Sequence, residues 1–380
     1  LLDHDFRRAM MRSRARLTYA QVQDAHEGRF DEVTSGLNES VITPLYGAYE
    51  ALARARATRG VLELDVPERR VLIDAAGDVA GIAVRERFDS HRLIEEFMIL
   101  ANVAAAETLE ARKVPCMYRV HDQPTPEKLA SLREFLETLG LKLPRGNLMK
   151  PHDFNRVLER AAQMPEARLV NEVVLRAQAQ AQYDPHNVGH FGLALKRYCH
   201  FTSPIRRYAD LVVHRALITA LKHGDGGLAA VDGDLEPLAQ HISATERRAA
   251  AAERDAVDRF TAAFLAERRG SQFTGRINGV TRFGLFVTLD ETAADGLIPI
   301  RTLPDDYYVH DERAHQLVGR ASGLTFRLGD RVEVRLVEAN PLTGGILFEI
   351  VAGLPAAGGR RRSSRLARTS SARPRAGRRG

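Results

Sequence analysis

The spacing of apolar residues divides the chain into a helix-rich part and a later part made of short strands. In the first part, apolar positions at helical spacing, bounded by glycine or proline, predict helices. They are expected at residues 42–59, 90–111, 125–139, 151–163, 165–183 and 235–267. Shorter apolar runs predict strands at residues 62–64, 70–73, 80–84 and 114–120. This order indicates a mixed α+β fold and not a repeating βαβ alternation.

The pattern changes at Gly270, after which short alternating strands are punctuated by glycine. These strands are expected at residues 273–280, 283–289, 296–300, 331–339 and 345–350. Five strands of this kind predict a small closed β-barrel. We therefore expect one domain at 1–268 and a second at 269–351. Residues 352–380 are rich in Gly, Pro, Ser and Arg, which predicts a disordered basic tail.

A further helix is expected to begin at Ser203, a residue type favoured at the N-cap, with Pro204 in the first helical position. Arg206 and Arg207 would then lie in the first turn, beside free backbone N–H groups. Two guanidinium groups at that place suit a bound anion such as a phosphate. Alternatively, the two arginines pair with carboxylates elsewhere in the fold. The spacing alone leaves both interpretations open.

The same region carries a family signature. It contains Gly-His-Phe-Gly-Leu-Ala-Leu from Gly189 and His-Phe-Thr-Ser-Pro-Ile-Arg-Arg-Tyr from His200, followed by Asp210, His214 and Arg215. This long run resembles the signature of the ribonuclease II/ribonuclease R (RNB) family, which are hydrolytic 3′-to-5′ exoribonucleases. The resemblance implies that Arg206 neutralises the scissile phosphate and that His190 and Arg207 contact RNA. It also implies that the products are nucleoside 5′-monophosphates.

Two more RNA-binding residues follow from the resemblance. Tyr19, in Ala-Arg-Leu-Thr-Tyr, matches a tyrosine beside the sugar of the terminal nucleotides. Glu95, in Ile-Glu-Glu, matches a glutamate that recognises ribose, and accepting the 2′-OH proton would favour RNA over DNA. Neighbouring Glu95 and Glu96 point about 100° apart on a helix, so at most one faces inward. Alternatively, both are solvated. A base-clamping phenylalanine of the family falls near Leu64, so one stacking surface is expected to be missing.

Glu253 lies on the long helix expected at 235–267, on an apolar face centred on Ala249. A carboxylate on a core-facing stripe needs a partner. That partner is either a structural arginine or Arg206 and the nucleotide it holds. Glu253 also matches a functional glutamate in the family's Ala-Glu-Arg-Asp motif.

The predicted barrel contains Phe283-Gly-Leu-Phe286 and resembles the S1-type OB-fold found at the end of ribonuclease R. In such barrels, exposed phenylalanines stack on bases without demanding a sequence. Phe283 and Phe286 match these positions, although Phe286 could instead belong to the core. Pro299 stands where many relatives have a histidine, which removes one polar RNA contact.

Composition adds the expected compartment. The chain has only two cysteines, Cys116 and Cys199, which argues against a disulfide framework or a cysteine metal site and suits the cytoplasm. No membrane-length apolar run and no signal peptide are visible, so we expect no membrane partner. The net charge is +6, but nine arginines and no acids lie at 360–380, so the rest of the chain is slightly acidic.

The family's Mg²⁺ ligands come from a four-aspartate motif upstream of the region that the resemblance covers. Asp3-x-Asp5 and the pair Asp305-Asp306 are the nearest imitations, and we assign no metal ligand in this chain. Because the chain begins with Leu1, we interpret it as the C-terminal portion of such an enzyme, inactive by itself and monomeric. Its partner would be the 3′ end of single-stranded RNA. The alternative is a non-catalytic RNA-binding module; a translation-associated OB-fold protein would leave the Arg206 signature unexplained.

Overall fold

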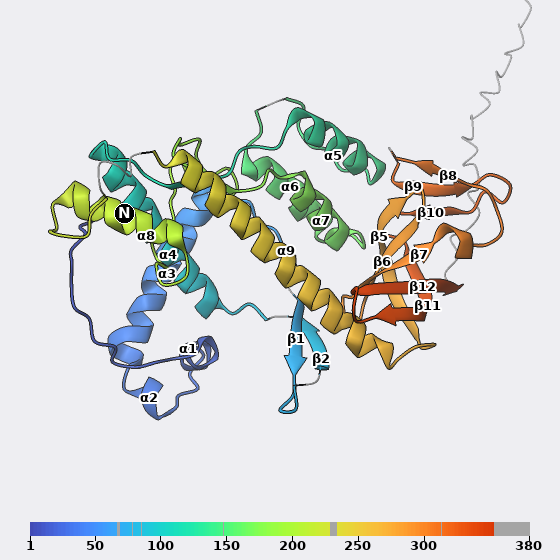
Figure 1. Cartoon of the computed structure of the whole chain (residues 1–380), viewed down its shortest axis with the longest axis horizontal. Helices are drawn as coiled ribbons and strands as arrows, with labels where there is room; N and C mark the ends of the chain where they lie inside the picture. The colour runs from blue at the N-terminus through green and yellow to red at the C-terminus, as the bar shows by residue number, and fades with distance from the viewer. Residues whose placement is uncertain are drawn as a thin grey trace, which may run out of the picture.

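The computed structural model describes residues 1–66, 69–77, 79–84, 86–146, 148–228, 234–312 and 314–352. Apart from Ala352, the expected basic tail lies outside this range. Figure 1 shows a mixed helical part on one side, a β-barrel on the other, and one long helix joining them. No helix of the described chain is both long and apolar enough to cross a membrane.

The first part contains helices and two small antiparallel sheets. Its helices are α1 (Tyr19–His26), α2 (Glu32–Ser35), a π-helix (Asn38–Ile42), α3 (Thr43–Arg59), α4 (Asp89–Ala111), α5 (Pro126–Thr138), α6 (Pro151–Ala161), α7 (Ala167–Ala177), α8 (Tyr208–Leu221) and α9 (Glu236–Ala266). Its strands are β1 (Arg69–Ile73) paired with β2 (Val79–Val84), and β3 (Tyr118–Val120) paired with β4 (Gln182–Asp184). The mixed fold expected from the sequence is confirmed.

Three of the expected elements in this part differ from the structure. Residues 62–64 form no strand, because their backbone is hydrogen-bonded to other elements: Glu63 N–H donates to Asn155 Oδ1 of α6 (2.9 Å) and Leu62 N–H to the carbonyl of Gly192 (2.9 Å). The helix expected at 165–183 ends at Ala177, after which Gln178 is extended and the chain leads into β4. By contrast, α3 ends as expected, with Gly60 in the left-handed conformation (φ 73°) that favours glycine.

The helix expected to begin at Ser203 begins instead at Tyr208, with Arg207 at the N-cap. Ser203 is part of a tight turn, in which its carbonyl accepts from the N–H groups of Arg206 (3.2 Å) and Arg207 (3.1 Å). The Ser203 N–H donates to Asp210 Oδ1 (2.6 Å). The turn does not continue into the helix because the backbone of Arg207 is extended (φ −125°, ψ 119°).

The second part is the five-stranded closed barrel expected from the sequence, with strand order β11-β12-β7-β6-β5. Its strands are β5 (Gln272–Thr281), β6 (Gly284–Leu289), β7 (Asp295–Pro299), β11 (Arg331–Asn340) and β12 (Gly345–Ala352). Gly284 has φ 154°, and a Cβ there would collide with the Ile298 carbonyl, so β6 and β7 approach closely only with glycine.

The sequence did not predict a three-stranded sheet beside the barrel. It contains β8 (Tyr308–Asp311), β9 (Gln316–Gly319) and β10 (Thr325–Arg327), in the order β10-β9-β8. These strands are short. The side chain of Asp306 holds the segment between β9 and β10. Asp306 accepts hydrogen bonds from the N–H groups of Ala321 (2.9 Å) and Ser322 (2.7 Å).

Helix α9 spans the two parts and packs mainly at its ends (Figure 1). Near its start, Ser243 Oγ accepts from the Tyr183 N–H of β4 (3.0 Å). Near its end, Ala262 and Leu265 are fully buried in the barrel core. The middle is exposed, including Ala249. The predicted apolar face centred on Ala249 is therefore wrong, because this stretch bridges the two parts instead of lying on either core.

Candidate functional site

An open pocket of about 1010 Å³ lies beside the first half of α4. Its walls come from α3, residues 63–66, residues 86 and 87, and α4. Glu95 and Glu96 both line it, but they differ in exposure and partners. Glu96 is 5% exposed and accepts from Arg56 Nη1 (2.7 Å). The Glu95 side chain is 39% exposed and pairs with Arg87, so one glutamate faces inward and the other faces the pocket.

Arg56 fixes one wall of this pocket. Burial works against its charge, but the carboxylates of Glu63 and Glu96 raise the pKa of its guanidinium above the ordinary value. Its Nε donates to Glu63 Oε1 (2.8 Å). Glu96 is thus part of a structural ion-pair group, whereas Glu95, although paired with Arg87, is the more exposed of the two glutamates in the pocket.

Tyr19 lies at the same end of α4. Thr18 caps α1, so that Tyr19 is the first helical residue. Its ring stacks on His91 of α4, with centroids 4.0 Å apart and planes 20° apart, and His91 lines the pocket. The Tyr19 carbonyl also accepts from Ser90 Oγ (2.8 Å). Tyr19 and Glu95 are therefore both positioned by α4, and their roles in binding a nucleotide stay predictions.

The two signature arginines have different environments. Arg207 donates through Nε (2.8 Å) and Nη2 (2.9 Å) to Asp210, whose side chain is fully buried. Arg206 is exposed and forms no ion pair or side-chain hydrogen bond with the described residues. Arg207 therefore braces the turn, and Arg206 remains available to an anion.

Beneath the turn lies a buried group of rings. Ring centroids are 5.1 Å apart for His121 and His190, 5.3 Å for His190 and Tyr198, and 5.7 Å for Tyr198 and His200. Burial, together with His121 and Arg119, lowers the pKa of His190 to about 3. Burial and the nearby Arg207 lower that of His200 to about 2. Both rings are therefore neutral at pH 7, and His190 contacts the protein more than the solvent.

Glu253 does not lie where the sequence predicted. It is exposed in the middle of α9, and no hydrogen bond or ion pair joins it to Arg206 or to any other described residue. The helix carries it on the solvent side, since α9 packs mainly near its ends. Its predicted role in RNA binding does not depend on the core position and stays a prediction.

The barrel carries both phenylalanines on an accessible surface. Phe283 is 53% exposed, and Phe286 is half-buried outside the barrel core, so the alternative that Phe286 is a core residue is wrong. Their rings are 6.1 Å apart at 87°. Phe286 also lines two open pockets of about 440 and 680 Å³.

One group of side chains in the described part has the spacing of metal ligands: Asp184, His186 and Glu236, whose ligand atoms lie within 4.8 Å of one another. Mg²⁺ prefers oxygen ligands in octahedral geometry. This group contains a histidine and lies where α9 begins, with a helix dipole unfavourable to cations. It does not fit Mg²⁺.

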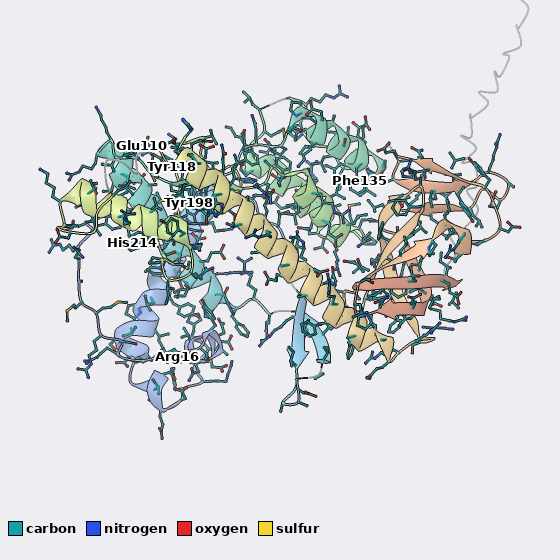
Figure 2. All side chains as sticks on the ribbon, in the orientation of Figure 1. Arg16, Glu110, Tyr118, Phe135, Tyr198 and His214 are labelled. Carbon is teal, nitrogen blue, oxygen red and sulfur yellow. The ribbon has the colours of Figure 1, made fainter. Side chains whose placement is uncertain are left out.

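Sequence reasoning assigned no role to three residues that organise the site. Asp210 holds the Arg206 turn, Asn102 of α4 bonds the segment that leads into it, and Glu246 of α9 accepts two bonds from Arg119 (2.6 and 3.0 Å). Two of them left a signal: Asp210 stands in the family signature, and Asn102 is a polar residue in an apolar helix, seven positions after Glu95. Figure 2 shows its partner Tyr198 among the side chains close to α4 and α8.

Both parts of the chain match known domain families. Residues 1–223 match the RNB domain family, and residues 268–350 match the S1 RNA binding domain family. The chain therefore belongs to the RNB family.

Its relatives include ribonuclease R of Aquifex aeolicus (strain VF5), which is 42% identical over 351 residues. That match covers 92% of this chain and 50% of the relative, so the chain spans about half the relative's length. Apo ribonuclease R of Mycoplasma genitalium has a similar structure (TM-score 0.82, 28% identity), covering 88% of this chain and 53% of that protein. A complex of the same enzyme with ribose methylated single-stranded RNA gives a TM-score of 0.81 at 28% identity over the same shares.

Proposed function

We propose that this chain supplies the RNA-holding surface and the phosphate-neutralising arginine of a 3′-to-5′ exoribonuclease that acts on single-stranded RNA. One observation carries the proposal: Arg206 is exposed and without an ion partner among the described residues, at a turn that Asp210 and Arg207 hold in place. The membership of the RNB family and the complex of a relative with single-stranded RNA support it.

Arg206 would act on the scissile phosphate. A guanidinium can donate two parallel hydrogen bonds to phosphate oxygens. As water attacks, negative charge builds on these oxygens, and a fixed cation stabilises it more in the transition state than in the ground state. Arg207 would contribute by position, because its charge is already matched by Asp210.

The pocket beside α4 would hold the terminal nucleotide. Glu95 would accept a hydrogen bond from the ribose 2′-OH, which DNA lacks. Tyr19, stacked on His91, would offer its other face to the sugar or base. His190, neutral in its buried group, and Glu253 on the exposed middle of α9 are the remaining proposed RNA contacts. Phe283 and Phe286 would stack upstream bases, which is worth about 1–3 kcal/mol per base.

A bound Mg²⁺ would supply stabilisation of the charge on the reacting oxygens. The one metal-spaced group among the described residues does not suit Mg²⁺, so we derive no step through the metal. A second candidate function is that the isolated chain binds RNA and does not cut it, and the match of the barrel to the S1 RNA binding domain family supports the binding. In that case the metal ligands would come from the enzyme's other residues.

The test is to incubate the chain with 5′-labelled single-stranded RNA, with Mg²⁺ or with a chelator, and to separate the products on a gel. A metal-dependent ladder shortening from the 3′ end supports the nuclease. Salt-sensitive binding without products supports the second candidate. Arg206→Ala should reduce RNA cleavage or, if the chain only binds, RNA affinity. The matched control is Arg320→Ala, which replaces an exposed arginine beside β9. Equal effects of both variants would contradict the role of Arg206.

A further inference from the structure

Asn102 lies in the middle of α4 and is 1% exposed. Both polar atoms of its side chain bond the segment 198–201. Its Nδ2 donates to Tyr198 Oη (2.9 Å), and its Oδ1 accepts from the Phe201 N–H (2.9 Å). Its carbonyl also accepts from Cys199 Sγ (3.3 Å). One buried residue thus holds this segment at three points.

An apolar residue at this position would avoid the cost of burying an amide. Asparagine instead fixes the geometry of its partners, because a buried amide whose hydrogen bonds are all made allows only one arrangement of them. The arrangement fixed here is that of the segment that leads from Tyr198 into the Arg206 turn.

The turn has a second anchor on α8. Asp210 bonds the Ser203 N–H (2.6 Å), and His214 Nε2 lies 2.9 Å from the Phe201 carbonyl. Arg206 is therefore held between α4, through Asn102, and α8, through Asp210. Loss of Asn102 would leave only the α8 anchor and allow the turn to move relative to α4.

Helix α4 also carries Glu95, seven residues before Asn102. At a rise of 1.5 Å per residue this is about 10.5 Å, nearly two complete turns, so the two side chains share a face. Tyr198, the partner of Asn102, is influenced by the charges of Arg207 and Glu95. Burial raises its pKa, the bond from Asn102 and the charge of Arg207 lower it, and Glu95 raises it.

We infer that Asn102 is a positioning residue: it holds the Arg206 turn at a fixed place along α4 relative to Glu95, so that one terminal nucleotide can meet both. This inference rests on the proposed function. It assigns Asn102 no contact with RNA, and it makes the phosphate contact of Arg206 depend on a residue that does not touch phosphate.

The test measures equilibrium binding of single-stranded RNA with a 3′-OH over a series of NaCl concentrations. The proteins are the wild type, Asn102→Ala, Arg206→Ala, the double variant, and Ile99→Val as a mild core change on the same helix. Loss of one phosphate contact should reduce the slope of log K against log salt by about 0.7. We expect Arg206→Ala to lose this slope and roughly tenfold in affinity, and Asn102→Ala to lose most of the same amount.

The double variant distinguishes positioning from general stability. We expect it to bind no more weakly than Arg206→Ala, because both changes remove one contact. If Asn102→Ala leaves the slope intact, or if its effect adds to that of Arg206→Ala, Asn102 has no positioning role. If Arg206→Ala itself changes neither affinity nor slope, the proposed phosphate contact fails instead. If Asn102→Ala does not fold, Tyr198→Phe removes only the bond from Asn102 Nδ2. It should cause a smaller loss of RNA affinity, which again does not add to that of Arg206→Ala.

Discussion

Replacing Asp210 by Asn is expected to destabilise the protein more than any charge change on its surface. The Asp210 side chain is fully buried and accepts three hydrogen bonds: from Ser203 N (2.6 Å), Arg207 Nε (2.8 Å) and Arg207 Nη2 (2.9 Å). Asparagine keeps the size and one acceptor oxygen but turns an NH₂ group toward the guanidinium. Arg207 would then remain four-fifths buried with its charge unmatched.

The size of the effect follows from these contacts. Breaking a buried ion pair by removing one partner costs about 3–5 kcal/mol. Arg207 keeps some access to water, so we expect the lower end, about 3 kcal/mol. Domains are stable by only about 5–15 kcal/mol, so this loss is a large fraction of the total.

Urea unfolding of the wild type and Asp210→Asn measures this loss. The matched control is Asp255→Asn, which removes an exposed pair with Arg259 on α9 (2.9 Å) and should cost less than about 0.5 kcal/mol. In an Arg207→Met background, Asp210→Asn should cost much less, because no cation is left unmatched. A loss equal to that of the control, or one that is unchanged in the Arg207→Met background, would refute the reasoning.

Three further predictions concern pH, RNA and folding. The pKa values of His190 (about 3) and His200 (about 2) lie below the unfolded value near 6.5, so the stability that these neutral rings allow is complete above pH 6.5 and is lost as the pH falls toward 3. His190→Gln should therefore reduce the slope of unfolding free energy against pH, between pH 6 and 5, by about 1.4 kcal/mol per pH unit. An unchanged slope would contradict this. Phe283→Ala should weaken RNA binding by about 1–3 kcal/mol at unchanged stability, whereas Val309→Ala outside the barrel should not, as binding titrations and thermal melts can check. Residues 1–268 alone should fold poorly, because Ala262 and Leu265 would lose the barrel core; a cooperative melt with slow amide exchange would show otherwise.

Patterns of apolar residues were sufficient for most of the fold. The barrel strands and the helices α3, α4, α5, α6 and α9 have periodic apolar faces or clear glycine and proline boundaries, and the structure places them as expected. The errors lie where side chains bond the backbone. Asn155 and the Gly192 carbonyl keep residues 62–64 from pairing as a strand, and Asp210 holds Ser203 in a turn that a local capping rule reads as a helix start.

The candidate site was only partly accessible to the same reasoning. The motif singled out Arg206 and Glu95, and the structure gives each the exposure that a ligand contact needs. The motif could not show that Arg207 pairs with Asp210, because the spacing of two adjacent arginines carries no information about their partners. Glu253 was misplaced for a different reason. Periodicity assumes that a helix lies on a core along its whole length, and α9 does so mainly near its two ends.

The buried polar residues bear on how an exposed arginine such as Arg206 would bind a phosphate. A long side chain on a free loop would sample many positions, and fixing it on binding would cost about 2 kcal/mol of rotamer entropy and further backbone entropy. Here the backbone entropy is already lost when the protein folds, because Asn102 and Asp210 hold both ends of the stretch from Phe201 to Arg207. Only the side-chain cost of Arg206 then remains at binding. The same logic predicts that variants of the anchors affect RNA affinity through Arg206, whereas variants of Arg206 affect affinity without changing stability.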